Sequence, residues 1–259
     1  MDPPLKGFYA RQLRKALCFS IAAIHLTAHM LFLGLYYILN HELRRYTVVL
    51  HFDGASFIFG SSRVSECSDA AELLIKHKAK YALLVQYDLV CDSALSFSVA
   101  LQDGVNARKH LVYLGISPSK IVISGDSAGG NIAVVLLRHV SEEESDGGNG
   151  YFLPNLVSYT LWGSSIDLPS QTCAHIDTHR DYITDHLAGL TLEWGINLYF
   201  PDLMEVTDSW FSLLLYSFPT PVPIRMVTER QREILSHTIV EFAAETKEVE
   251  GNKVELHEI

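Results

Sequence analysis

The most informative segment of this chain for its fold is Lys120-Ile-Val-Ile-Ser-Gly-Asp-Ser-Ala-Gly-Gly-Asn-Ile-Ala-Val-Val-Leu-Leu137. A β-branched run ends at Ser124, and an apolar helical pattern begins at Asn131. The segment therefore predicts a strand, a tight turn and a helix. The turn holds a Gly-x-Ser-x-Gly pentapeptide at residues 125–129, whose glycines let the flanking backbones pass closely.

The sharp turn predicts a chemical role for its serine. A serine at a sharp strand-to-helix turn is strained and exposes its hydroxyl, and the next N–H, at a helix N-terminus, can stabilise an oxyanion. Ser127 is therefore a candidate nucleophile and the Ala128 N–H a candidate oxyanion donor. The alternative is an ordinary strand-to-helix turn, because glycine and serine are common in turns.

The composition limits the partners of the chain. Its 259 residues carry a net charge of −10, which disfavours a nucleic-acid partner. The histidines show no His-Glu-x-x-His spacing, so we expect no metal and no cofactor. The four cysteines form no Cys-x-x-Cys and are interpreted as ordinary thiols, with one disulfide left open for an oxidising compartment.

An apolar stretch precedes the first strand. Residues 16–39 carry no Asp, Glu, Lys or Arg, and this length can span a bilayer. Basic residues before it favour a cytosolic N-terminus and a lumenal body, as for an anchor in an endoplasmic-reticulum-like membrane. His25 and His29 lower its hydrophobicity, so a buried or lid helix in a cytoplasmic protein stays open. We treat residues 1–45 as a separate segment.

Strand and helix patterns alternate through residues 46–259, which predicts an α/β fold with a mostly parallel central sheet. The other predicted strands cover Tyr46–Phe52, Tyr81–Tyr87, Leu156–Leu161, Pro223–Thr228 and Lys253–Leu256, and the other predicted helices Asp69–Lys80, Phe97–Leu114 and Arg230–Glu248. The acidic, glycine-rich residues 141–150 predict a solvated loop, and residues 167–208 a cap-like insertion with helical pieces.

Three motifs in this order resemble the α/β-hydrolase-3 group, the hormone-sensitive-lipase-like esterases. They are Asp53-Gly-Ala-Ser-Phe57, Tyr87-Asp-Leu-Val-Cys-Asp92 and Gly125-Asp-Ser-Ala-Gly-Gly-Asn131. The resemblance implies an α/β-hydrolase fold and a carboxylic ester hydrolase that attacks a small apolar ester or acetyl ester through a serine acyl-enzyme. With its N-terminal apolar stretch, the chain also resembles fungal membrane-bound steryl-acetate hydrolases.

The resemblance implies roles for particular residues. Ser127 matches the nucleophile, and Glu233 matches the acid, with Glu229 and Glu241 as alternatives. The implied oxyanion hole consists of backbone N–H groups of Gly54, Ala55, Ser56 and Ala128. Aromatic residues that can line an acyl or alcohol pocket, or simply pack the core, are Trp162, Trp194, Tyr199, Phe200 and Trp210.

The departures from the family pattern concern the oxyanion hole and the base. Asp53 replaces the motif histidine and brings a carboxylate to the place where negative charge develops. His257 is the candidate base, although it lies on the predicted last strand, a few residues early. Both ends look abbreviated relative to the family. The alternative function is a catalytically impaired pseudo-hydrolase that acts as a binding or regulatory protein.

Overall fold

The structure, a computed structural model, describes residues 47–62, 81–90, 97–145, 158–183, 185, 187–200, 208–228 and 233–259. All of them belong to the unit Tyr46–Ile259. The apolar stretch 16–39, the predicted helix 69–80 and the end of the second motif lie outside the described residues. Among the helices in the described ranges, none has the length and apolar character needed to cross a membrane.

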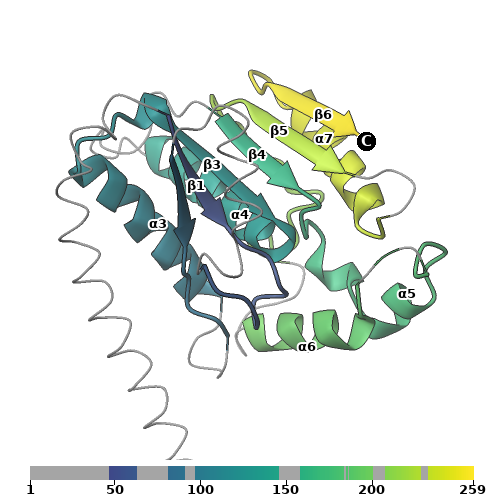
Figure 1. Cartoon of the computed structure of the whole chain (residues 1–259). Coiled ribbons are helices and arrows are strands. Elements are labelled where there is room, and N and C mark those ends of the chain that lie inside the picture. The colour runs from purple at the N-terminus through teal and green to yellow at the C-terminus, as the bar shows by residue number, and fades with distance from the viewer. Residues whose placement is uncertain are drawn as a thin grey trace, which may run out of the picture. The chain divides into compact units, whose positions relative to one another are not determined.

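Six parallel strands of the described chain form one sheet in the order β2-β1-β3-β4-β5-β6 (Figure 1). Their bounds are β1 Val48–Phe52, β2 Tyr81–Val85, β3 Ile121–Asp126, β4 Ser158–Trp162, β5 Ile224–Thr228 and β6 Val254–Glu258. The predicted α/β fold with a mostly parallel sheet is therefore confirmed.

Helices flank this sheet. Their bounds are α3 Ser98–Tyr113, α4 Ser127–Ser145, α5 Cys173–Asp177, α6 Gly189–Tyr199 and α7 Ser236–Glu248, with short 3-10 turns at Pro118–Lys120 and Leu168–Ser170. The core lies between the strands and the helices α3, α4 and α7. One row of registered residues across the sheet, Leu50, Ile123, Tyr159 and Ile224, is buried to 2% exposure or less.

The two faces of the sheet differ at its β5–β6 end. Ile224 and Met226 are buried on the face that α7 covers, whereas Arg225 and Glu255, paired across the strands, are exposed on the other face. Side chains alternate between faces along a strand, so the sequence period of two decides which residues enter the core.

Some element boundaries differ from the predicted ones. Helix α4 begins at Ser127 instead of Asn131 and runs to Ser145, through half of the predicted loop 141–150. An i,i+4 ion pair between Arg138 and Glu142, at 2.8 Å, supports this extension. Helix α7 begins at Ser236, six residues after the predicted start at Arg230.

Candidate active site

The turn from β3 into α4 forms a sharp elbow at Ser127. Strand β3 ends at Asp126, and Ser127 has a φ of 47°, a left-handed conformation that only glycine adopts freely. A Cβ at Gly125 would meet the Gly129 carbonyl oxygen, and a Cβ at Gly129 would meet the Phe52 carbonyl oxygen. The two glycines are therefore required for the close passage of three backbone segments.

The loop after β4 braces this elbow. The Ser165 N–H donates to the Ser127 carbonyl at 3.0 Å, and the Asn131 side-chain amide donates to the Ser165 carbonyl at 2.8 Å. Asn131 is fully buried, so its hydrogen bond forms away from water. These bonds fix the first turn of α4, and with it the backbone of the candidate nucleophile.

The loop after β1 lies beside Ser127 and has an unusual backbone. Ala55, Ser56 and Phe57 all have positive φ, at 70°, 57° and 64°. A Cβ placed on Gly54 would lie 3.1 Å from the Ser127 Cβ, so this loop reaches the nucleophile. The predicted oxyanion residues Gly54, Ala55 and Ser56 are therefore next to the elbow, and Ala128 is buried at the start of α4.

Replacing Ala55 by glycine should stabilise the protein. A left-handed residue with a Cβ costs roughly 1–2 kcal/mol, and glycine removes that cost while losing more backbone entropy on folding. We expect Ala55→Gly to raise the free energy of unfolding by roughly 0.5–1 kcal/mol in urea denaturation. The matched control is Ala133→Gly inside α4, which should lower it by about 1 kcal/mol. An Ala55→Gly variant as destabilised as the control would contradict the left-handed assignment.

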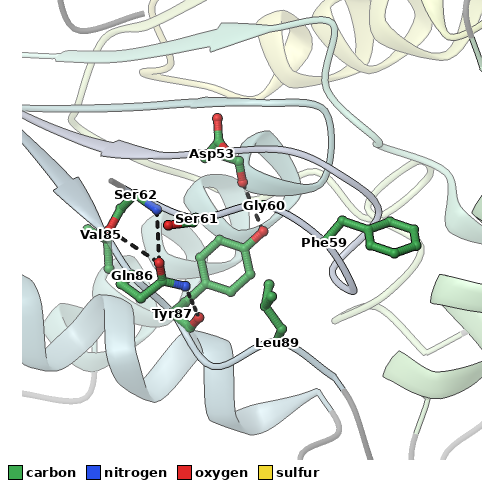
Figure 2. A pocket seen from close by; sticks show the side chains of 9 residues that line it. All are labelled: Asp53, Phe59, Gly60, Ser61, Ser62, Val85, Gln86, Tyr87 and Leu89. Carbon is green, nitrogen blue, oxygen red and sulfur yellow. Dashed lines mark hydrogen bonds between the residues drawn. The ribbon is translucent and has the colours of Figure 1, made fainter. Parts of the chain in front are cut away.

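Tyr87, which follows β2, anchors the loop after β1 (Figure 2). Its hydroxyl donates to the Asp53 and Gly54 carbonyl oxygens, each at 2.9 Å, and its side chain lines a small hollow beside the loop. Gln86 closes one side of this hollow by accepting from the Ser62 N–H at 2.9 Å. The residues lining it are Asp53, Phe59, Gly60, Ser61, Ser62, Val85, Gln86, Tyr87 and Leu89. The hydrogen bonds of Tyr87 and Gln86 therefore hold the segment after β1 in place.

Helix α6 packs directly on the same loop. A Cβ at Gly195 would meet the Ser56 carbonyl oxygen, and the Tyr199 ring stacks on Phe57 with centroids 3.9 Å apart. Burial raises the pKa of Tyr199 above its usual value, which keeps this phenol neutral in the core. Trp194 is 52% exposed and meets Phe59 edge to face, so Tyr199 packs in the core whereas Trp194 stays accessible.

The structure places Glu233 at the carboxyl ends of β4 and β5. The Thr228 hydroxyl, at the end of β5, donates to Glu233 Oε2 at 2.6 Å. A Cβ at Gly163, just after β4, would meet Glu233 Oε1. The carboxylate therefore lies between the ends of β4 and β5. Of the alternatives, Glu229 is outside the described residues, and Glu241 lies on α7 in an exposed pair with His237.

The structure does not bring His257 to Ser127. The strand registers place Asp126, Trp162, Val227 and His257 in one row across β3 to β6. Three strand spacings separate the ends of this row, or roughly 14 Å. The His257 side chain is 54% exposed and lies 3.7 Å from Glu255, whose pKa is lowered mainly by its hydrogen bond with Arg225.

One group of polar residues beside the elbow is absent from the sequence-based assignments. His51 Nε2 lies 3.3 Å from Asp126 Oδ1, and Asp53 has an oxygen within 4.8 Å of both groups. The signal was present in the sequence. His51 and Asp53 are two residues apart at the end of a strand, which predicts that they share one face.

Comparisons with known proteins agree with this geometry. A family described as the alpha/beta hydrolase fold matches residues 49–259. Human "Arylacetamide deacetylase-like 2" is 32% identical over 110 residues, 39% of this chain and 26% of that protein. "Esterase LipU" of Mycobacterium tuberculosis is 33% identical over 94 residues, 36% of this chain and 30% of that protein. The matches thus span less than a third of either relative.

Solved structures share the fold. The structure described as EstE5-PMSF superposes with a TM-score of 0.65 at 22% identity, covering 82% of this chain and 65% of that chain. An esterase from the bacterial hormone-sensitive lipase family superposes with a TM-score of 0.63 at 20% identity, covering 82% and 66%. At this identity the likeness concerns the fold alone.

Proposed function

Because the chain belongs to the alpha/beta hydrolase fold family, we propose that it hydrolyses small apolar carboxylic esters through a Ser127 acyl-enzyme. One observation carries this proposal. Ser127 holds a φ of 47° at the start of α4, where a strained backbone persists only if its surroundings enforce it. Such strain is typical of a nucleophile elbow.

The reaction follows acyl transfer. The Ser127 Oγ attacks the ester carbonyl carbon, its proton passes to the base, and the carbonyl oxygen becomes an oxyanion. N–H groups of the loop at Gly54–Ser56 and of Ala128 stabilise that charge, helped by the N-terminus of α4. The base returns the proton to the departing alcohol. Water then attacks the acyl-enzyme by the reverse roles, releasing the acid and restoring the Ser127 hydroxyl.

Glu233 and His257 take the acid and base roles in this proposal. Glu233 is close to the strand next to the elbow, where a carboxylate can orient an imidazole. Proton transfer needs about 2.6–3.2 Å between heavy atoms. This is far less than the roughly 14 Å that separates His257 from Asp126, the residue before Ser127, across the sheet. His257 must therefore approach Ser127 to accept its proton, and we expect turnover to be slow because that approach is rare.

The substrate class rests on the surface around the elbow. Phe59, Leu190 and Trp194 are 50%, 75% and 52% exposed, and Trp194 and Phe59 are in contact. Large apolar side chains held at a surface are typical of a site that binds an apolar group. The names of the relatives, a deacetylase-like protein and an esterase, fit an acetyl or other short acyl ester.

Fluorophosphonate labelling tests the proposal. We expect a covalent adduct on the peptide that carries Ser127, located by mass spectrometry. The adduct should form more slowly in Glu233→Gln and His257→Gln, and at the wild-type rate in His237→Gln, which alters an exposed histidine of α7. Undiminished labelling of His257→Gln would remove His257 as base. A folded chain that takes no label would be a pseudo-hydrolase with an inherited elbow.

A further inference from the structure

Three ligand-type side chains meet beside the elbow, on one face of the sheet. His51 pairs in register with Ser124, and Asp53 and Asp126 follow two residues after each of them. Because side chains alternate along a strand, His51, Ser124 and Asp126 point to the same face, and Asp53 follows directly after the end of β1. One ligand atom from each of His51, Asp53 and Asp126 lies within 4.8 Å of the others. The sheet itself therefore builds this cluster.

The imidazole of His51 is buried and incompletely bonded. His51 is 3% exposed, and its Nε2 makes no hydrogen bond within the described part of the chain. Nε2 lies 3.3 Å from Asp126 Oδ1, but this contact lacks hydrogen-bond geometry. A buried polar nitrogen left in this way costs free energy unless another group satisfies it.

The other side of the imidazole is held in place. His51 Nδ1 lies 3.2 Å from the Ser124 Oγ, which also accepts the Trp162 Nε1–H at 3.3 Å. A ring N–H bonded to an oxygen acceptor orients metal-bound histidines and leaves the other nitrogen bare. His51 contacts Ser124 through one ring nitrogen and Asp126 through the other, as the histidine of a catalytic triad contacts its serine and its aspartate. Ser124 is fully buried, however, and is inaccessible to an ester.

The two carboxylates are arranged around this nitrogen. The second oxygen of Asp126, Oδ2, lies 2.6 Å from a Cβ added at Gly54, and Asp53 Oδ2 lies 3.1 Å from a Cβ added at Gly60. Two carboxylates this close repel each other, and a cation between them removes the repulsion. The Asp126 side chain is 42% exposed, so an ion can enter from solvent.

We propose that His51 Nε2, Asp53 and Asp126 bind a divalent transition-metal ion of the Zn²⁺ type. Imidazole and carboxylate are ligands that such ions use at about 2.0–2.2 Å. Two ligands of a tetrahedral ion then lie roughly 3.4 Å apart, close to the observed 3.3 Å between Nε2 and Oδ1. Asp53 moves closer to the other two ligands when the ion binds. The ion cancels negative charge beside the oxyanion loop and joins the end of β1 to the end of β3.

Metal titration of the full chain tests this site. After dialysis against a chelator, we titrate Co²⁺ and follow its visible ligand-field absorption, then displace it with Zn²⁺. We expect one tightly bound ion per chain. Asp53→Asn, at a half-buried position, should weaken binding by about 100-fold, as should His51→Gln. Circular dichroism establishes that each variant is folded.

The matched control is the exposed pair His237 and Glu241, in which His237 Nδ1 lies 3.4 Å from Glu241 Oε2. The double variant His237→Gln, Glu241→Gln should bind Co²⁺ as the wild type does. Equal Co²⁺ affinity in the wild type and Asp53→Asn, or no binding by the wild type, would overturn the proposal. Ser127→Ala should bind the ion normally, so failure of the metal site and failure of ester hydrolysis are separate results.

Discussion

Replacing Ser127 by alanine is expected to abolish measurable ester hydrolysis while the protein stays folded. The side chain supplies the only oxygen that the proposed reaction acylates, so its loss removes the covalent path and leaves oxyanion and binding effects. We expect kcat on a short p-nitrophenyl ester to fall by about 10³-fold or to the background rate. A variant that keeps its activity would exclude the serine mechanism.

Ser127→Gly provides the matched comparison. Alanine and glycine both lack the hydroxyl, but only glycine adopts a φ of 47° without strain. The glycine variant should therefore be equally inactive and more stable than the alanine variant by roughly 1 kcal/mol in urea denaturation. If the two variants are equally stable, the elbow stores no backbone strain at Ser127.

Replacing Gly129 by alanine should destroy the elbow itself. The added Cβ would collide with the Phe52 carbonyl and lie 2.6 Å from the Asp53 carbonyl oxygen. Both are backbone atoms of the strand end next to β3, so no side-chain rotation relieves the clash. We expect a loss of stability of about 3 kcal/mol or more, together with loss of labelling at Ser127. Thermal unfolding and the labelling assay measure the two effects.

Gly251→Ala is the control for this prediction. Gly251 has a φ of 89° but no atom within 4 Å of an added Cβ, so its replacement measures the cost of the backbone conformation alone. We expect it to lower stability by about 1 kcal/mol and to leave labelling unchanged. Equal losses in the two variants would contradict the close approach of α4 to β1.

The sequence was sufficient to predict the fold and the elbow. The β-branched run before Gly125 and the apolar helical pattern after Gly129 depend on local periodicity, which a single chain displays directly. The parallel sheet followed from alternating strand and helix patterns. The positions of Glu233 and His257 followed from the family resemblance, and their catalytic roles stay predictions.

Other features depend on contacts that periodicity does not encode. The left-handed run at residues 55–57 forms in residues that disfavour it, because α6 and Tyr87 hold the loop from two sides. The early start of α4 arises because the glycines at its N-terminus are packed against β1 and the loop after β4. The meeting of His51 with Asp126 requires the register of two strands.

The strand order also determines how late in synthesis the centre of the sheet can form. Strand β1 lies between β2 and β3, and the contact of His51 with Ser124 joins residues 73 positions apart. At about 5–20 residues per second, a ribosome needs roughly 4–15 s to make that interval. During this time the apolar β1 has no β3 to pair with and is exposed to aggregation. Slower growth at low temperature, or a chaperone that binds nascent apolar strands, should therefore increase the yield of folded chain.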